Sequence, residues 1–196
     1  MRENLTFADA ISKNAYLGRT SKEINAAIIT NYLRSFGWTD EAIAATLGNM
    51  ETESTINPGI WENLQQGDVT HGFGLVQWTP ATKLINWCNE NGRTYTSMQA
   101  QLDRILWELA TGEQWIPTSK YPMSFENYTT STETPEYLAQ VFLYNYERPA
   151  VTPQTARSIQ ARNWYNYIKD IQPPETDAHR KNLSLLLLIL ATRRRF

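Results

Sequence analysis

The sequence has a single cysteine, Cys88, among 196 residues. One thiol excludes an internal disulfide framework and a zinc site built from cysteines. The chain has only two histidines, no HExxH motif and no pairing of cysteine with histidine suited to amide hydrolysis. We therefore expect no metal and no cofactor, and we interpret His71 as an ordinary loop residue.

Long apolar runs are also missing. The first 20 residues contain no uninterrupted apolar stretch, so no secretory signal is predicted. The longest run, Leu183–Ala191, has nine residues, whereas a membrane-spanning helix needs about 20. Basic residues flank this run, so we expect the 183–196 tail to dock into a partner protein or to insert shallowly into a membrane. The alternative is a helix packed on its own domain.

Positive charge is scarce outside the C-terminus. The formal net charge is −2, but residues 179–196 hold five basic residues and no acidic one. The preceding part has 13 basic and 20 acidic groups, a net charge of −7. Phosphate binding needs a basic surface. The acidic body therefore argues against nucleic acid as a ligand.

Helical patterns cover most of the chain. We expect one folded domain over residues 20–171, preceded by an N-terminal extension (1–19) and followed by a linker (172–182) and the tail. Apolar residues recur at helical spacing, and start signals precede several of these stretches. The predicted N-caps are Thr20, Thr39, Thr79 (followed by Pro80) and Thr134 (followed by Pro135).

Residues 56–80 lose the helical period and are rich in glycine. The Gly67–Asp68 pair is suited to a tight turn, so we predict a short β hairpin here. The expected fold class is α+β, mainly α, with a small β hairpin between helices.

Three stretches carry the chemistry: LGNMETESTINPG at 47–59, GFGLVQWTP at 72–80 and YERPA at 146–150. In this order and spacing they resemble the lysozyme domain in tail lysins of short-tailed phages that infect Gram-positive bacteria, over about residues 20–170. Glu-Ser followed by Gly-Leu-x-Gln is more distantly similar to goose-type lysozymes and lytic transglycosylases. The resemblance implies a lysozyme-like fold, attack on peptidoglycan glycan strands and a place at the tail tip of a virion.

Glu53 matches the catalytic acid of that family, whereas Glu51 does not. Cleavage of a glycosidic bond near neutral pH requires a carboxylic acid that is still protonated, which apolar burial favours. Glu51 and Glu53 lie on opposite flanks of the apolar stripe that ends with Leu47 and Met50, so either could be half buried and helix geometry does not choose between them. A solvated surface glutamate is the alternative.

A second catalytic carboxylate is less evident. Most glycosidases use two, and Asp68, in the predicted hairpin turn, is the best-placed candidate. Turns also favour aspartate for purely structural reasons. Without a partner, water would attack with help from the substrate, or the sugar's own hydroxyl would close an anhydro ring as in transglycosylases.

The glycine-rich stretch also holds candidates for substrate binding. The amide of Gln77 is suited to holding a sugar hydroxyl or N-acetyl group, or to a structural hydrogen bond. Gly74 would let the backbone approach a sugar ring, or would simply permit a tight turn. Trp78 is either a sugar platform or a core residue.

Tyr146 and Glu147 resemble the segment that lines the family's cleft opposite the acid. The alternative for Glu147 is an ion pair with Arg148 at a helix end.

The expected function is a virion-borne, wall-degrading enzyme that opens the cell wall for DNA delivery, with the tail docked into other phage tail proteins. One alternative is a catalytically idle lysozyme-like module with a structural or wall-recognition role. A soluble endolysin is another, although it would usually carry a wall-binding domain, and we predict none.

Overall fold

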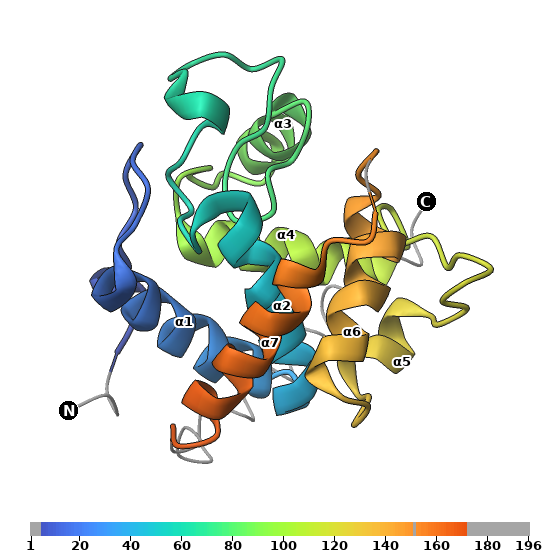
Figure 1. Ribbon diagram of the computed structural model, residues 1–196. Helices are drawn as coiled ribbons and strands as arrows, with labels where there is room; N and C mark the ends of the chain where they lie inside the picture. Colours follow the sequence, from blue (N-terminus) through green and yellow to red (C-terminus); the bar gives the residue numbers. More distant parts are fainter. Residues whose placement is uncertain (1–4, 151, 172–196) are drawn as a thin grey trace.

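The computed structural model describes residues 5–150 and 152–171 (Figure 1). The expected linker and tail, 172–196, lie outside these residues. No helix among the described residues is long and apolar enough to cross a membrane. The described part contains seven α-helices: α1 (Arg19–Arg34), α2 (Asp40–Ser54), α3 (Thr82–Glu90), α4 (Met98–Thr111), α5 (Phe125–Thr129), α6 (Pro135–Phe142) and α7 (Thr155–Ile168).

Helix α2 is the central element, and α1, α6 and α7 pack around it (Figure 1). Every residue from 42 to 50 is buried. The Thr39 hydroxyl accepts a hydrogen bond from the Ala42 amide at 3.3 Å, which confirms the predicted N-cap. The helix ends at Thr55 and Ile56, which both adopt the left-handed backbone conformation, with φ of 55° and 57°. The carboxylates of the ETES stretch therefore lie at the last turn of a buried helix.

Helices α2 and α7 are in close backbone contact at Gly48. A Cβ atom at this position would lie 2.7 Å from the backbone nitrogen of Ala161 and 2.7 Å from the carbonyl oxygen of Arg157. Glycine in mid-helix lowers helix stability. Here it lets the two backbones come into contact.

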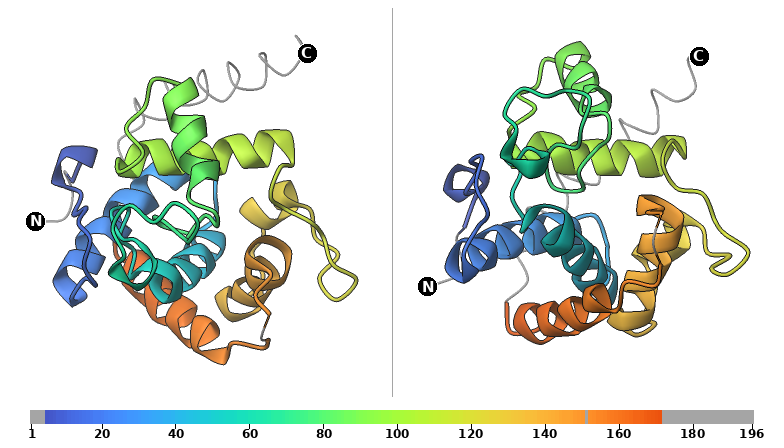
Figure 2. Two further views of the ribbon diagram at one scale, coloured as in Figure 1. Left: turned by 90° about the horizontal axis from the view of Figure 1, so that it is seen from above. Right: turned by 45° about the horizontal axis from the view of Figure 1, so that its top comes forward.

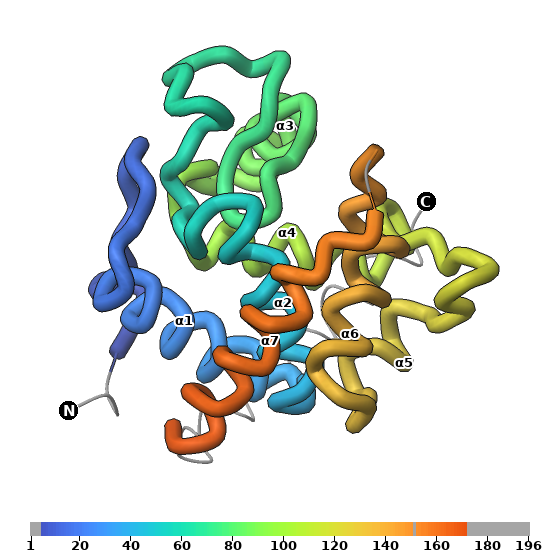
Figure 3. Tube along the Cα trace, viewed as in Figure 1, coloured from blue at the N-terminus to red at the C-terminus, as the bar shows by residue number. Residues whose placement is uncertain are grey.

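The structure does not show the predicted β hairpin. The mainly helical fold is confirmed, but among the described residues the glycine-rich segment contains only isolated bridges, Trp61 to Phe73 and Phe73 to Trp78. Positive φ angles at Asn63, Leu64 and Gln77 interrupt the extended backbone that paired strands need. The segment instead forms a compact loop above the end of α2, beside α3 (Figures 2 and 3).

Two predicted helix starts are also wrong. Helix α1 begins at Arg19 with Gly18 as its N-cap, so Thr20 lies inside the helix. Helix α3 begins at Thr82, with Ala81 as its N-cap. The Thr79 hydroxyl caps no helix, because it donates to the Gln77 carbonyl at 2.9 Å. The Thr134 and Pro135 start is confirmed.

The described part of the N-terminal segment, residues 5–18, packs on the helical domain. The Asn25 side chain accepts from the Ile11 amide and donates to the Ile11 carbonyl, both at 2.8 Å. The side-chain amide of Asn57 donates to the backbone carbonyls of Lys13 and Ala15 at 2.6 and 2.7 Å. These contacts attach the segment to α1 and to the loop that follows α2.

We expect Gly48→Ala to destabilise the protein by about 1–3 kcal/mol, because an added methyl group overlaps backbone atoms that cannot move aside. Thermal or denaturant unfolding measures this change. Gly18→Ala is the control for added bulk, since a Cβ at Gly18 meets nothing within 4 Å, and it should cost only the small preference for glycine over alanine at the N-cap of α1. Equal stability of the two variants would contradict the close α2–α7 contact.

Candidate active site

A cavity of about 480 Å³ opens beside the last turn of α2. One wall is α2, a second is the glycine-rich segment, and a third is the chain that follows α6. Three carboxylates, two amides and two cationic side chains are among the residues that line it: Glu53, Glu62, Val76, Gln77, Trp78, Thr79, Lys83, Gln114, Tyr146, Glu147, Arg148 and Pro149. This polar, partly open shape suits a hydroxyl-rich ligand.

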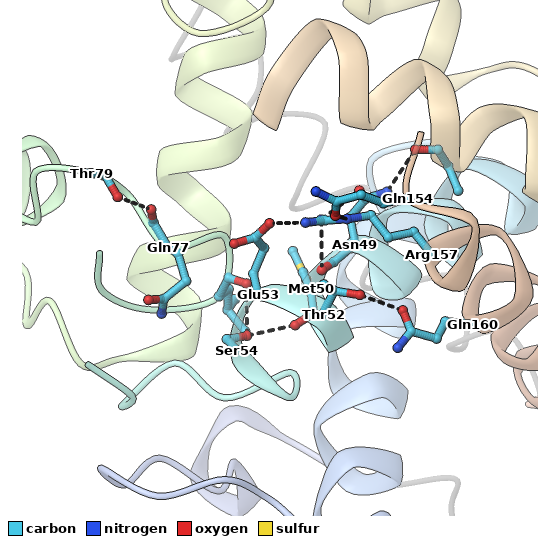
Figure 4. Close-up of polar contacts among 12 residues, drawn as sticks. Asn49, Met50, Thr52, Glu53, Ser54, Gln77, Thr79, Gln154, Arg157 and Gln160 are labelled. Carbon is cyan, nitrogen blue, oxygen red and sulfur yellow. Dashed lines mark hydrogen bonds and ion pairs between the residues drawn. The ribbon is translucent and has the colours of Figure 1, made fainter. Parts of the chain in front are cut away.

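The carboxylate of Glu53 is held by an ion pair with Arg157, which comes from the first turn of α7 (Figure 4). The Glu53 side chain remains 20% exposed, whereas that of Arg157 is only 3% exposed. The guanidinium also donates to the Asn49 side chain at 3.0 Å and to Gln154 at 2.7 Å. Asn49 and Glu53 are one helical turn apart, so the same cation is bound twice by one face of α2.

Ser54 connects α2 to the opposite wall. Its hydroxyl lies 2.9 Å from the carbonyl oxygens of both Met50 and Leu75, and it accepts from the backbone amide of Asn57 at 3.2 Å. This contact fixes the glycine-rich segment relative to Glu53. In Figure 4, Gln77 lies across the opening from Glu53.

Two of the predicted binding residues in the glycine-rich segment line the cavity, and one does not. Gln77 does, and its amide nitrogen also donates to the carbonyls of Gly74 at 2.9 Å and Ile60 at 3.3 Å. Trp78 reaches the cavity wall but is 4% exposed. Gly74 lies outside the lining, because it has φ of 82° and packs against Gln101, whose side-chain oxygen would lie 2.6 Å from an added Cβ.

A buried carboxylate behind the cavity positions the third wall. Glu108 accepts hydrogen bonds from Trp78 Nε1 and Arg104 Nε, both at 2.9 Å, and from the Tyr146 hydroxyl. Burial raises the pKa values of Glu108 and of Tyr146. Tyr146 is 1% exposed, so it contributes to the cavity as a fixed wall.

Glu147 also lines the cavity, but its surroundings differ from those of Glu108. It ends a π-helical turn, Leu143–Glu147, that follows α6. The expected alternative, an ion pair with Arg148, does not form among the described residues. Arg148 Nη1 instead donates to the carbonyls of Gln114 at 2.6 Å and Asn145 at 2.7 Å.

Asp68 lies outside the cavity lining, in an exposed turn. Its carboxylate accepts from the Thr70 hydroxyl at 2.6 Å and the Thr70 amide at 3.0 Å, and it lies 2.9 Å from His71 Nδ1. These hydrogen bonds, those of Thr70 first, lower the pKa of Asp68. The structure therefore does not bring Asp68 together with Glu53. The part of the chain that the structure describes also contains no group of three His, Cys, Asp or Glu side chains able to hold a metal.

Sequence reasoning missed Arg157 and Glu62. Arg157 is in phase with Ala161, Trp164 and Ile168, the other buried residues of α7, and a charged residue on such a stripe is a detectable signal of a buried cation. Glu62 gives no comparable signal. Its carboxylate accepts from the Gly72 amide at 2.8 Å, a contact that depends on the loop fold.

Comparison with known proteins supports the resemblance on which the site assignment depends. Residues 24–168 match the phage tail lysozyme family. The chain is also 53% identical, over 154 residues, to morphogenesis protein 1 of Bacillus phage B103. The match covers 79% of this chain and 42% of that relative, so this chain spans less than half the length of the protein that it resembles. With most of its described domain matched, the chain belongs to the phage tail lysozyme family.

Proposed function

We propose that this protein is a glycosidase that cleaves the glycan strands of peptidoglycan, and that it acts from the phage tail during DNA delivery. Membership of a phage tail lysozyme family supports the substrate class. The likeness to a phage morphogenesis protein supports a place in the virion. We place the protein at the tail tip, where contact with the cell wall would occur.

One observation carries the proposal: Glu53, the glutamate of the ES motif, lies at the wall of a polar cavity and is held there by Arg157. Glycosidic cleavage needs a carboxyl group in a fixed position beside the leaving oxygen. The buried guanidinium fixes the direction of the Glu53 carboxylate, and the 20% exposure leaves it accessible from the cavity. We assign Glu53 as the acid that protonates the leaving oxygen.

The cavity has room on the side opposite Glu53 for a sugar whose hydroxyl or N-acetyl group contacts Gln77. With Asp68 occupied elsewhere, the oxygen that attacks the anomeric carbon would come from water or from the sugar's own hydroxyl. These are the hydrolase and transglycosylase forms of one reaction. A catalytically idle wall-recognition module remains the competing function, and activity measurements separate it from both.

We expect Glu53→Gln to reduce wall lysis by about 10²–10⁴-fold, the usual contribution of a general acid. The glutamine side-chain oxygen can still accept from Arg157, although the charge of Arg157 is then uncompensated. The variant should therefore be less stable than the wild type but still folded by circular dichroism. Zymograms on purified peptidoglycan measure the loss.

Glu51→Gln is the matched control, two residues earlier on the same helix. The Glu51 carboxylate lies outside the cavity lining. It pairs with Lys22 and accepts from Trp164 Nε1 at 2.8 Å. This variant should keep most of the activity. If both variants were equally active, Glu53 would not be the acid, and if the wild type were inactive on every wall tested, the idle module would be favoured.

Digestion should break the β-1,4 bond between N-acetylmuramic acid and N-acetylglucosamine. Mass spectrometry of digested walls identifies the products. Muramic acid at the reducing ends indicates hydrolysis, and anhydro ends indicate a transglycosylase. Cleaved stem peptides with intact glycan strands would refute both.

A further inference from the structure

Glu147 is the one carboxylate at the cavity, among the described residues, with a buried oxygen that has no hydrogen-bond partner. Its Oε1 atom is removed from solvent and meets no donor. An ionised carboxylate without partners in a buried position is strongly unfavourable, whereas a neutral carboxyl group is tolerated. The position of Glu147 therefore favours a side chain that keeps its proton.

The charged groups around Glu147 act in the same direction on balance. Burial has the largest effect and raises the pKa of Glu147 well above its ordinary value. The negative charges of Glu53 and Glu108 raise it further, whereas the positive charges of Arg157 and Arg148 lower it. Both arginines are engaged elsewhere: Arg157 with Glu53 and Asn49, and Arg148 with two backbone carbonyls.

Glu53 has different partners. Its carboxylate forms a direct ion pair with the buried Arg157 and stays 20% exposed. The ion pair holds Glu53 in position, yet a general acid must carry a proton when the glycosidic bond breaks. The unpartnered carboxyl oxygen of Glu147 lies at the same cavity, so a second acidic group is available there to hold that proton.

We propose that Glu53 and Glu147 act as a pair that holds one proton between them, with Glu147 as the positioning residue that keeps this proton available to Glu53. This inference rests on the proposed function, because it assigns a partner to the acid of that reaction. The proton passes from Glu147 to Glu53, directly or through a water molecule. Such a pair titrates as a unit.

The proton balance closes for both forms of the reaction. The C1–O bond breaks, its electron pair goes to the leaving oxygen, and that oxygen takes the proton from Glu53. The pair then holds no proton. Addition of water, or of the sugar's own hydroxyl, to C1 releases one proton, which returns to the pair.

The backbone supports this placement of Glu147. The π-helical turn brings Tyr146 under the cavity and Glu147 to its edge, and it ends where Arg148 adopts the left-handed conformation with φ of 50°. Short π-helical turns occur often at functional sites. An ordinary α-helical continuation of α6 would rotate Glu147 to a different position.

The test is the pH dependence of kcat/KM for Glu147→Gln on soluble peptidoglycan fragments. Glutamine is nearly isosteric with the neutral acid, so the variant should fold. Without the second acid, the last proton should leave the site at lower pH. The alkaline limb of the pH profile should therefore shift to lower pH by about one unit or more. At any pH above this limb, each unit of the shift should make the variant about tenfold slower than the wild type. At acidic pH the rates should converge.

Two further variants make the result specific. Glu147→Asp keeps a carboxyl group and should restore most of the alkaline activity. Glu51→Gln makes the same chemical replacement on the far side of α2 and should leave the limb unmoved. An equal loss of activity at every pH for Glu147→Gln would mean a purely structural role and would overturn the proposal.

A second readout does not require activity. In protein labelled with ¹³C at the glutamate carboxyls, the signals of Glu108 and Glu147 should both remain in their protonated positions above the ordinary titration range of glutamate. Glu147→Gln should remove one of these two signals and leave the other. If the Glu147 signal is present but the wild type cleaves no glycan, the proposed function fails and the proton-holding pair stands. If glycan is cleaved but Glu147→Gln removes no late-titrating signal, the pair is wrong and the proposed function stands.

Discussion

The cleft depends on the ion pair between Glu53 and Arg157, which joins the end of α2 to the start of α7. Arg157 is almost completely buried, so its charge must be compensated inside the protein. Glu53, Asn49 and Gln154 together satisfy the guanidinium. Buried pairs of this kind contribute little net stability but fix relative position, since loss of one partner leaves an isolated charge. Gly48 makes the arrangement possible because it lets α7 lie against α2.

The second wall is held to this helix pair by buried amide and hydroxyl groups. Ser54 binds the Leu75 carbonyl, and Gln101 of α4 accepts from the Leu75 amide at 2.8 Å. The Gln101 nitrogen donates to the carbonyls of Pro58 and Tyr95, both at 2.7 Å. Side chains thus replace the strand ladder that this segment lacks. The lack of side-chain bulk at Gly74 is what allows Gln101 to approach.

Two carboxylates near the cleft, Glu108 and Glu147, show how hydrogen-bond partners separate structural from chemical roles. Glu108 has three donors and holds Trp78 and Tyr146 in place. Glu147 has a buried oxygen with no donor, although it lies only one residue from Tyr146. A fully satisfied buried group rigidifies its surroundings. An unsatisfied one at a cavity is a candidate for proton chemistry.

Much of the helical framework follows from local sequence. The apolar spacing of residues 39–54, the Thr39 cap and the Thr134–Pro135 start are local signals, and the structure confirms them. The family and its ES motif were also recognisable from short stretches, and the family match confirms the first of these. The structure does not show the predicted hairpin: glycines and turn residues indicate where a chain bends and not whether two strands pair.

Only the tertiary structure decided which carboxylates share the cavity. Asp68 and Glu53 are 15 residues apart in sequence, yet local turn contacts keep Asp68 outside the cavity lining. Glu53 and Arg157 are 104 residues apart and form an ion pair. Local patterns determine periodic burial and helix ends, because those depend on near neighbours. The charge state of a carboxylate depends on the desolvation and partners that distant segments supply, and these exist only once the chain has folded.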